Sequence, residues 1–153
     1  MSKTGSLNHI DISVGRPERS IPFYDVFFRA LGYKRWKLED PDWDWAKPQR
    51  ATWSIRQADG VIFAVETRPA SPESRDQKYD RYAPGPHHLA FNAESNDVVD
   101  RVHDAMVAVG AIVLDPPTDY GRERGYSVGY YAVFFADPDN LKLEVVHIPQ
   151  TRT

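Results

Sequence analysis

Two stretches of the sequence share one layout and decide the fold: NHIDISVGRPERSIPFYDVFFRALGY at residues 8–33 and HHLAFNAESNDVVDRVHDAMVAVGAI at residues 87–112. Each begins with a histidine and an alternating strand, passes through a polar turn into an amphipathic helix, and reaches a glycine where the helix should stop. An internal repeat of this length indicates that the chain contains two copies of one structural unit.

Apolar residues recur at helical spacing in both stretches. The predicted buried faces are Tyr24, Phe27, Phe28 and Leu31 in the first helix, and Val98, Val102, Ala105 or Met106, and Val109 in the second. Ser95 or Asn96 is the expected N-cap of the second helix. Gly32 and Gly110 are the expected stops.

Strand-like runs follow each helix. ATWSIRQADGVIFAVE (residues 51–66) predicts a hairpin that turns at residues 58–60. GAIVL (residues 110–114) and YYAVFFADPDNLKLEVVHI (residues 130–148) predict a strand and a second hairpin, with its turn at residues 137–140. Each half therefore has the order β-α-β-β-β, and the fold class is α+β.

The domain boundaries follow from composition. Residues 7–148 are expected to form one domain, with a first module at 7–67 and a second at 86–148. RPASPESRDQKYDRYAPG (residues 68–85) is Pro-rich and charged, which is typical of a linker, and it is long enough to pair the modules within one chain or between two. The irregular stretch at residues 34–50 holds Trp36, Trp43 and Trp45, and is either a lid or a small satellite cluster.

Composition favours a soluble protein that handles small molecules. The 153 residues are 41% hydrophobic and 27% charged, with a formal net charge of -3 and no cysteine. No apolar stretch approaches the ~20 residues of a membrane span, and the N-terminus lacks the apolar core of a secretory signal. Scattered arginines give no basic footprint for nucleic acid. We expect a cytoplasmic protein with a small-molecule substrate and no nucleic-acid or membrane partner.

Strand alternation sorts polar residues from packed ones, because successive side chains point to opposite faces. In LNHIDISV the isoleucines and the valine are expected on the packed face, so His9 lies on the opposite face. In HHLAFNA the same alternation places His88 on the face opposite the packed one. In LKLEVVHI the carboxylate of Glu144 is turned away from the packed leucines. If the two sheets form a cup, these three side chains line it. Two imidazoles and one carboxylate suit Fe(II), Mn(II), Zn(II) or Ni(II).

Further residues face the same side or stand close to it. Glu66 and Tyr130 are candidates for proton transfer by facing alone. The candidate substrate-binding residues are Arg50, Ser54, Asn92, Phe134, Arg122 and Arg124. For the two arginines of the segment DYGRERGY, a solvated charged loop is the alternative reading.

Residues 7–148 resemble the vicinal oxygen chelate superfamily, which includes glyoxalase I, bleomycin-resistance proteins, fosfomycin-resistance transferases, methylmalonyl-CoA epimerases and extradiol dioxygenases. The motifs that carry the resemblance are the first stretch quoted above, GPHHLAFNA, and FFADPDNLKLEVV. The resemblance implies two paired βαβββ modules that form a cup-shaped mixed sheet around a divalent metal, with the helices outside.

Carried over by position, the family's ligands fall on His9, His88 and Glu144, and the fourth position falls on Ala64. Glyoxalase I and the epimerases look four-liganded, so an alanine there argues against both activities unless Glu66 substitutes. A His-His-Glu trio resembles the dioxygenases and the fosfomycin-resistance transferases instead. Both of those carry a functional tyrosine where this sequence has Phe134.

Two functions are therefore expected to compete. The first is a metal-dependent enzyme, of lyase, isomerase, transferase or dioxygenase type, acting on a small oxygen-rich substrate that chelates the ion. The second is a metal-free ligand-binding protein like the bleomycin-resistance proteins. A homodimer is expected in either case.

Overall fold

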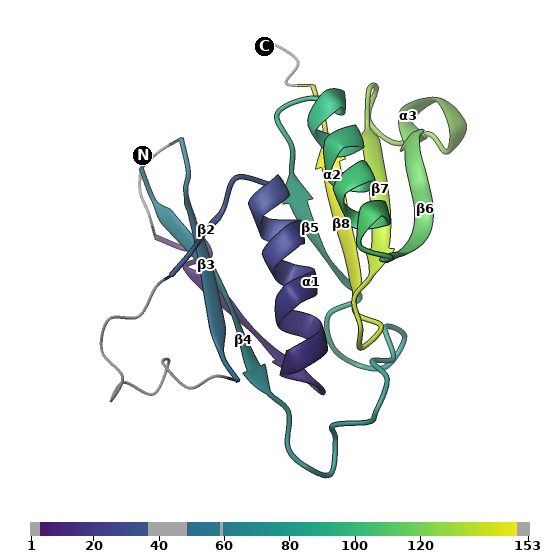
Figure 1. The fold of residues 1–153 in the computed structure, drawn as a ribbon. Coiled ribbons are helices and arrows are strands. Elements are labelled where there is room, and N and C mark those ends of the chain that lie inside the picture. Colours follow the sequence, from purple (N-terminus) through teal and green to yellow (C-terminus); the bar gives the residue numbers. More distant parts are fainter. Residues whose placement is uncertain (1–3, 37–48, 59, 150–153) are drawn as a thin grey trace. The chain divides into compact units, whose positions relative to one another are not determined.

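The computed structural model describes residues 4–36, 49–58 and 60–149 (Figure 1). The chain divides into two compact units, residues 1–77 and 78–153. The described residues form two four-stranded mixed sheets with helices, so the α+β class and the βαβββ order predicted for each half are confirmed.

The first unit contains one helix and one sheet. Its elements are β1 (His9–Val14), α1 (Pro17–Ala30), β2 (Lys34–Arg35), β3 (Ala51–Arg56) and β4 (Ile62–Pro69). The strand order is β1-β4-β3-β2, with β1 parallel to β4 and the other pairs antiparallel. Because β1 and β4 are parallel, the helix and two strands between them are needed to carry the chain back to the same end of the sheet.

Helix α1 packs on the sheet through aromatic side chains. Tyr24 and Phe28 contact the ring of the buried Trp53 on β3, at centroid distances of 6.0 and 5.2 Å. Phe27 is also buried, so this part of the predicted apolar face is confirmed. The helix ends as the sequence predicted: Gly32 has a φ of 83°, and its N–H donates to the carbonyl of Arg29.

The second unit repeats the order with one addition. Its elements are β5 (His88–Asn92), α2 (Asn96–Ala108), β6 (Ile112–Asp119), α3 (Tyr120–Glu123), β7 (Tyr131–Ala136) and β8 (Lys142–His147). The strand order is β5-β8-β7-β6, and the first pair is parallel. The short helix α3 is the addition, and it was not predicted from the sequence.

Helix α2 covers one face of the second sheet, but through a face rotated from the predicted one. The buried residues are Val99, Val102 and Met106, whereas Val109 is 54% exposed because the helix ends at Ala108. Ser95 is the N-cap, and its hydroxyl accepts from the N–H of Val98.

Three boundaries differ from those predicted. Residues 34 and 35 form β2 instead of starting an irregular stretch, because they pair with β3. Strand β4 runs to Pro69, so Arg68 is a strand residue although the sequence analysis placed it in the linker. Strand β6 continues to Asp119, with register shifts that interrupt its pairing with β7. Trp43 and Trp45 lie outside the described residues.

None of the helices in the described part of the chain is long and apolar enough to cross a membrane.

Candidate functional site

In the second unit the polar candidates lie on the sheet face opposite α2. The strand register places Ala90 beside Glu144 and Glu144 beside Phe134, so these residues share one face. His88, the first residue of β5, lies on the same face two residues before Ala90. The opposite face carries Tyr131, whose hydroxyl donates to Asp100 of α2 at 2.8 Å. Strand parity therefore sorted the second sheet correctly.

Glu144 is a buried carboxylate with two partners. Only 2% of the residue is exposed. The hydroxyl of Tyr130 donates to its Oε1, and Nε2 of His88 lies 2.9 Å from its Oε2. A buried carboxylate needs such partners to offset its lost hydration. Burial, followed by the bond to Glu144, raises the pKa of Tyr130 above its usual range, so this phenol stays protonated.

His87 is the second neighbour of His88. Its Nδ1 lies 2.8 Å from Nδ1 of His88, and the two rings meet edge to face. Strand parity alone would turn the side chain of His87 to the packed face. His87 instead precedes β5 and is exposed, so strand parity does not fix its direction. Desolvation, and then the charges of His88, Lys142 and Arg81, lower its pKa.

Aromatic side chains surround this group. Tyr120 of α3 is 4% exposed and packs edge to face on both Tyr130 and Phe134. Phe134 also carries the ammonium of Lys142 over its ring, at 4.0 Å from the centroid. Sequence reasoning missed Tyr120. The signal was Asp119, whose carboxylate accepts from the N–H of Arg122 and starts the short helix that brings Tyr120 onto the sheet.

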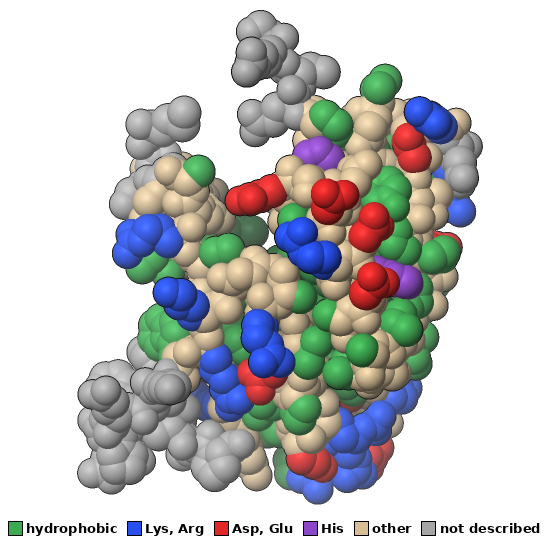
Figure 2. All heavy atoms as spheres, turned by 45° about the horizontal axis from the view of Figure 1, so that its top comes forward, with side chains coloured by type: hydrophobic (Ala, Val, Ile, Leu, Met, Phe, Trp, Pro, Cys, Tyr) green, Lys and Arg blue, Asp and Glu red, His purple; other side chains and the backbone are tan. Residues whose placement is uncertain are grey.

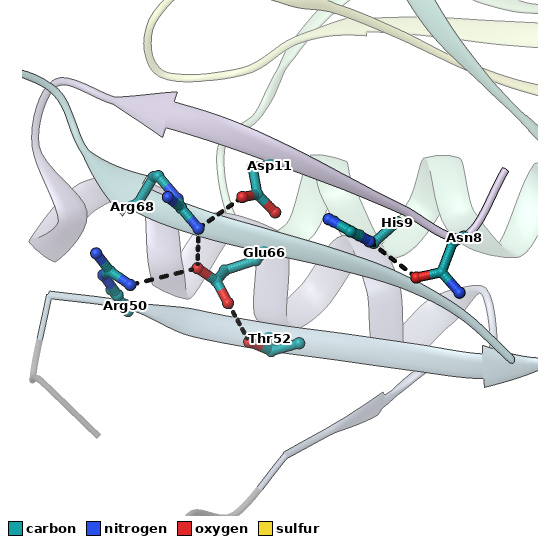
Figure 3. A network of polar contacts seen from close by, with 7 residues as sticks. All are labelled: Asn8, His9, Asp11, Arg50, Thr52, Glu66 and Arg68. Atoms are coloured by element: carbon teal, nitrogen blue, oxygen red, sulfur yellow. Dashed lines mark hydrogen bonds and ion pairs between the residues drawn. The ribbon is translucent and has the colours of Figure 1, made fainter. Parts of the chain in front are cut away.

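In the first unit the face opposite α1 is polar, as parity predicted. Figure 3 shows the side chains that it gathers from β1, β3 and β4. His9 is exposed, and its Nδ1 lies 2.9 Å from Oδ1 of Asn8. His9 and His88 are the first residues of β1 and β5, so the equivalence drawn from the repeat is confirmed for their positions in the strands.

Glu66 lies at the centre of a charged cluster on this face (Figure 3). Its Oε1 is 2.8 Å from Arg68 and 3.8 Å from Arg50, and its Oε2 accepts from Thr52 at 3.2 Å. The same Arg68 nitrogen lies 2.6 Å from Asp11. Two cations and two anions therefore balance one another within a small area of the sheet.

The strand registers show which residue of the first unit is equivalent to Glu144, and it is not the residue predicted from the sequence. His88 lies opposite Lys142, and Glu144 follows two residues later on β8. In the first unit His9 lies opposite Ala64, so the residue two places later on β4 is Glu66. The sequence analysis assigned this position to Ala64, which is wrong, because the parallel pairing of β1 with β4 sets the equivalence. Each unit thus carries one His and one Glu at matching places.

The remaining predicted substrate-binding residues either contact another side chain or are exposed to solvent. Ser54 accepts a hydrogen bond from Nε1 of Trp36 at 2.8 Å. Asn92 ends β5 and is exposed. Arg122, with 89% of its side chain exposed, lies 3.3 Å from Asp119, and Arg124 stacks over the ring of Tyr120 at 5.2 Å. In the face drawn in Figure 2, basic side chains are interspersed with acidic ones.

The donor chemistry of the two His-Glu pairs fits a divalent ion, since imidazole and carboxylate together suit first-row metals. His88 and Glu144 already contact each other. His9 and Glu66 belong to the other unit. Among the described residues, no three His, Asp or Glu side chains stand close enough together to hold an ion.

The chain belongs to the glyoxalase/bleomycin resistance protein/dioxygenase superfamily, whose family model matches residues 6–145. This agrees with the resemblance to the vicinal oxygen chelate proteins. It also agrees with the two mixed sheets described above.

Individual relatives cover nearly the whole chain. An uncharacterized protein of Bacillus subtilis (strain 168), YqjT, is 30% identical over 142 residues, which are 92% of this chain and 97% of that protein. The crystal structure of a candidate glyoxalase from Bacillus halodurans has a TM-score of 0.70 and 26% identity, covering 95% of this chain and 97% of its own. A glyoxalase/dioxygenase from Nostoc punctiforme shares the fold, with a TM-score of 0.68 at 17% identity and coverages of 97% and 94%.

Proposed function

We propose that this protein is a divalent-metal-dependent enzyme of lyase or isomerase type that acts on a small, oxygen-rich substrate. The observation that carries the proposal is the matched register of the two units, which gives each sheet one His and one Glu at equivalent positions. Each unit therefore offers one imidazole and one carboxylate to an ion: His9 and Glu66 in the first, His88 and Glu144 in the second.

The fourth donor changes the choice among reactions. With Ala64 at the fourth position, the pattern resembled the dioxygenases and the transferases. With Glu66 there, it resembles the four-liganded glyoxalase I and the epimerases. Phe134 points the same way, because the dioxygenases and transferases carry a functional tyrosine at its place.

The surrounding residues support this assignment. A divalent cation would offset the lost hydration of the buried Glu144. We assign Tyr130 to holding Glu144 in place and not to taking up a proton, because its hydroxyl already donates to Glu144 and stays protonated. Glu66, named above as a proton-transfer candidate, is assigned to the ion.

A bound divalent ion would supply Lewis-acid stabilisation of the negative charge that develops on a substrate oxygen. The protein's own part would be to orient that substrate. On the second unit, the partly buried ring of Phe134, which lies beside Glu144 and packs on the buried Tyr120, offers an apolar surface to its carbon skeleton. On the first, Arg50 and Arg68 offer positive charge beside Glu66.

Elemental analysis of protein purified without a histidine tag tests the proposal. We expect near-stoichiometric divalent metal in the wild type and its loss in H9A, E66Q, H88A and E144Q. D11N and H103A are matched controls that should retain metal, since they remove a neighbouring carboxylate and another imidazole. Metal that is absent from the wild type, or retained by H88A and E144Q, would overturn the proposal. Retention by E66Q alone would reduce the set to the three donors of the dioxygenase type.

One observation favours a second function, a metal-free ligand-binding protein. Both oxygens of Glu144 have partners within the described chain, so this carboxylate is satisfied by Tyr130 and His88 alone. A binding protein would respond to its ligand equally with and without a chelator. Tryptophan fluorescence during ligand titration separates the two functions.

A further inference from the structure

We propose that His87 is a positioning residue for His88: its ring holds the ring of His88 through an Nδ1 to Nδ1 hydrogen bond and, together with Glu144, fixes which nitrogen of His88 carries the hydrogen while no ion is bound. The part of this inference that concerns metal binding by His88 rests on the function proposed above. The fixing of the hydrogen does not depend on a metal.

The hydrogen positions follow from the partners. An ionised carboxylate can only accept hydrogen bonds, so in the contact with Glu144 the hydrogen lies on Nε2 of His88. A neutral imidazole then has an acceptor at Nδ1. Nδ1 of His87, 2.8 Å away, must therefore be the donor.

The two histidines can also form a hydrogen bond in the opposite direction, with His88 as the donor and His87 as the acceptor. A histidine that binds an ion through Nε2 must carry its hydrogen on Nδ1 and donate it to a neighbour. His87 can accept that hydrogen at Nδ1 while a hydrogen from solvent occupies its own Nε2. The bridging hydrogen shifts from His87 to His88, and the Nε2 hydrogen of His88 leaves to solvent, so the number of hydrogens on the pair is unchanged. A lysine or a backbone carbonyl could serve only one of the two arrangements.

The chain before β5 is anchored so that His87 reaches this place. The N–H of Tyr79 donates to the carbonyl of Asp139 at 2.8 Å, and the side chain of Asn140 donates to the carbonyl of Tyr79 at 2.9 Å. The hydroxyl of Tyr79 donates to the carbonyl of Pro86, directly before His87. The ring of Tyr82 packs edge to face on the ring of His87, at a centroid distance of 5.6 Å.

These contacts tie residues 79–86 to the turn between β7 and β8, which is the turn that leads into the strand of Glu144. The two partners of the His88 ring are therefore positioned by one connected piece of structure. A residue held only for packing would not need its ring nitrogen aimed at His88.

Nitrogen-15 NMR of the imidazoles in the full-length, metal-free protein tests the inference directly. In the wild type we expect the hydrogen of His88 on Nε2 and that of His87 on Nδ1. H87A should allow His88 to populate the other tautomer. H87N, whose amide lies where Nδ1 of the histidine would be, should restore the wild-type pattern. H103A should leave the His88 signals unchanged.

Zinc titration supplies the second arm. The wild-type pair should exchange its hydrogens as zinc binds, and H87A should bind zinc about 10- to 100-fold more weakly, with recovery in H87N. A His88 tautomer that is the same in the wild type, H87A and H87N would overturn the inference. If zinc does not bind but H87A shifts the His88 tautomer, the proposed metal function fails while the positioning role stands.

Discussion

Glu144 and His88 are 2.9 Å apart between Oε2 and Nε2, on neighbouring parallel strands, and the other oxygen of Glu144 accepts from Tyr130. The carboxylate of Glu144 is almost fully buried and joins the phenol of Tyr130 to the imidazole of His88. The contribution of each link to stability can be measured apart from any metal.

The bond between Tyr130 and Glu144 should appear as coupling in a double-mutant cycle. Each of Y130F and E144L leaves a polar partner unsatisfied and should cost about 1–3 kcal/mol in the free energy of unfolding. The double variant should cost less than the sum of the two, by about 0.5–3 kcal/mol. Urea unfolding of the metal-free proteins measures all three. Strictly additive costs would show that the bond does not form in solution.

The protein should lose stability at alkaline pH through its tyrosines. Burial raises the pKa of both Tyr33 and Tyr131 to about 12, above the value of ~10 in an unfolded chain. A raised pKa gives stability that is fully present below pH ~10 and is lost as the pH rises toward ~12, because only the unfolded chain ionises in that window. Urea midpoints from pH 9 upward should therefore fall.

A matched variant isolates one of these groups. In Y131F the group that titrates late is absent, so the alkaline fall in the urea midpoint should be smaller than in the wild type. An ultraviolet titration should show one fewer late-ionising phenol. An identical alkaline profile for both proteins would assign the fall to other groups.

The charged cluster of the first unit should depend more on Glu66 than on Asp11. Both contact the same nitrogen of Arg68, but 12% of the Glu66 side chain is exposed against 33% of the Asp11 side chain. E66Q leaves two arginines beside a single carboxylate and should cost about 1–3 kcal/mol. D11N breaks a better hydrated pair and should cost about 1 kcal/mol or less.

Salt provides the internal check on this pair. The cost of D11N should shrink between low and high ionic strength, because exposed charges are screened, whereas that of E66Q should change less. The comparison uses urea midpoints of the two variants in the same buffers. A larger cost for D11N than for E66Q would contradict the proposed order.

Gly121 should tolerate no side chain. A Cβ at this position would lie 2.6 Å from the carbonyl oxygen of Ser127 and 3.0 Å from the N–H nitrogen of Gly129. G121A should therefore push α3 away from the following loop and cost about 1–3 kcal/mol. R122A in the same helix is the control, since that side chain is 89% exposed and its loss should change stability by about 0.5 kcal/mol at most.

The spectroscopic signature of G121A should be local. Tyr120 packs on Tyr130 and Phe134, so near-ultraviolet circular dichroism should weaken in G121A and stay unchanged in R122A. Wild-type stability together with an intact tyrosine signal in G121A would show that the loop adjusts without cost.

Much of the fold could be predicted because it rests on local patterns. The period of apolar residues identified both helices, and Gly32 and Gly110 marked their ends. Strand alternation sorted His9 and His88 to the face opposite the helix. The apolar face of α2 was misjudged at Val109, because the helix ends one residue earlier than the periodicity suggested.

The sequence by itself thus determined the two-unit plan and the sheet face on which the polar strand residues His9, His88 and Glu144 lie, since both follow from spacing along a single strand or helix. Only the tertiary structure decided which residues are equivalent and which meet. The parallel pairing of β1 with β4, far apart in the chain, made Glu66 and not Ala64 the counterpart of Glu144. A short helix brought Tyr120 to Tyr130, and an anchored segment brought His87 to His88. Pairings between distant strands and the placement of irregular segments depend on contacts that no local pattern encodes.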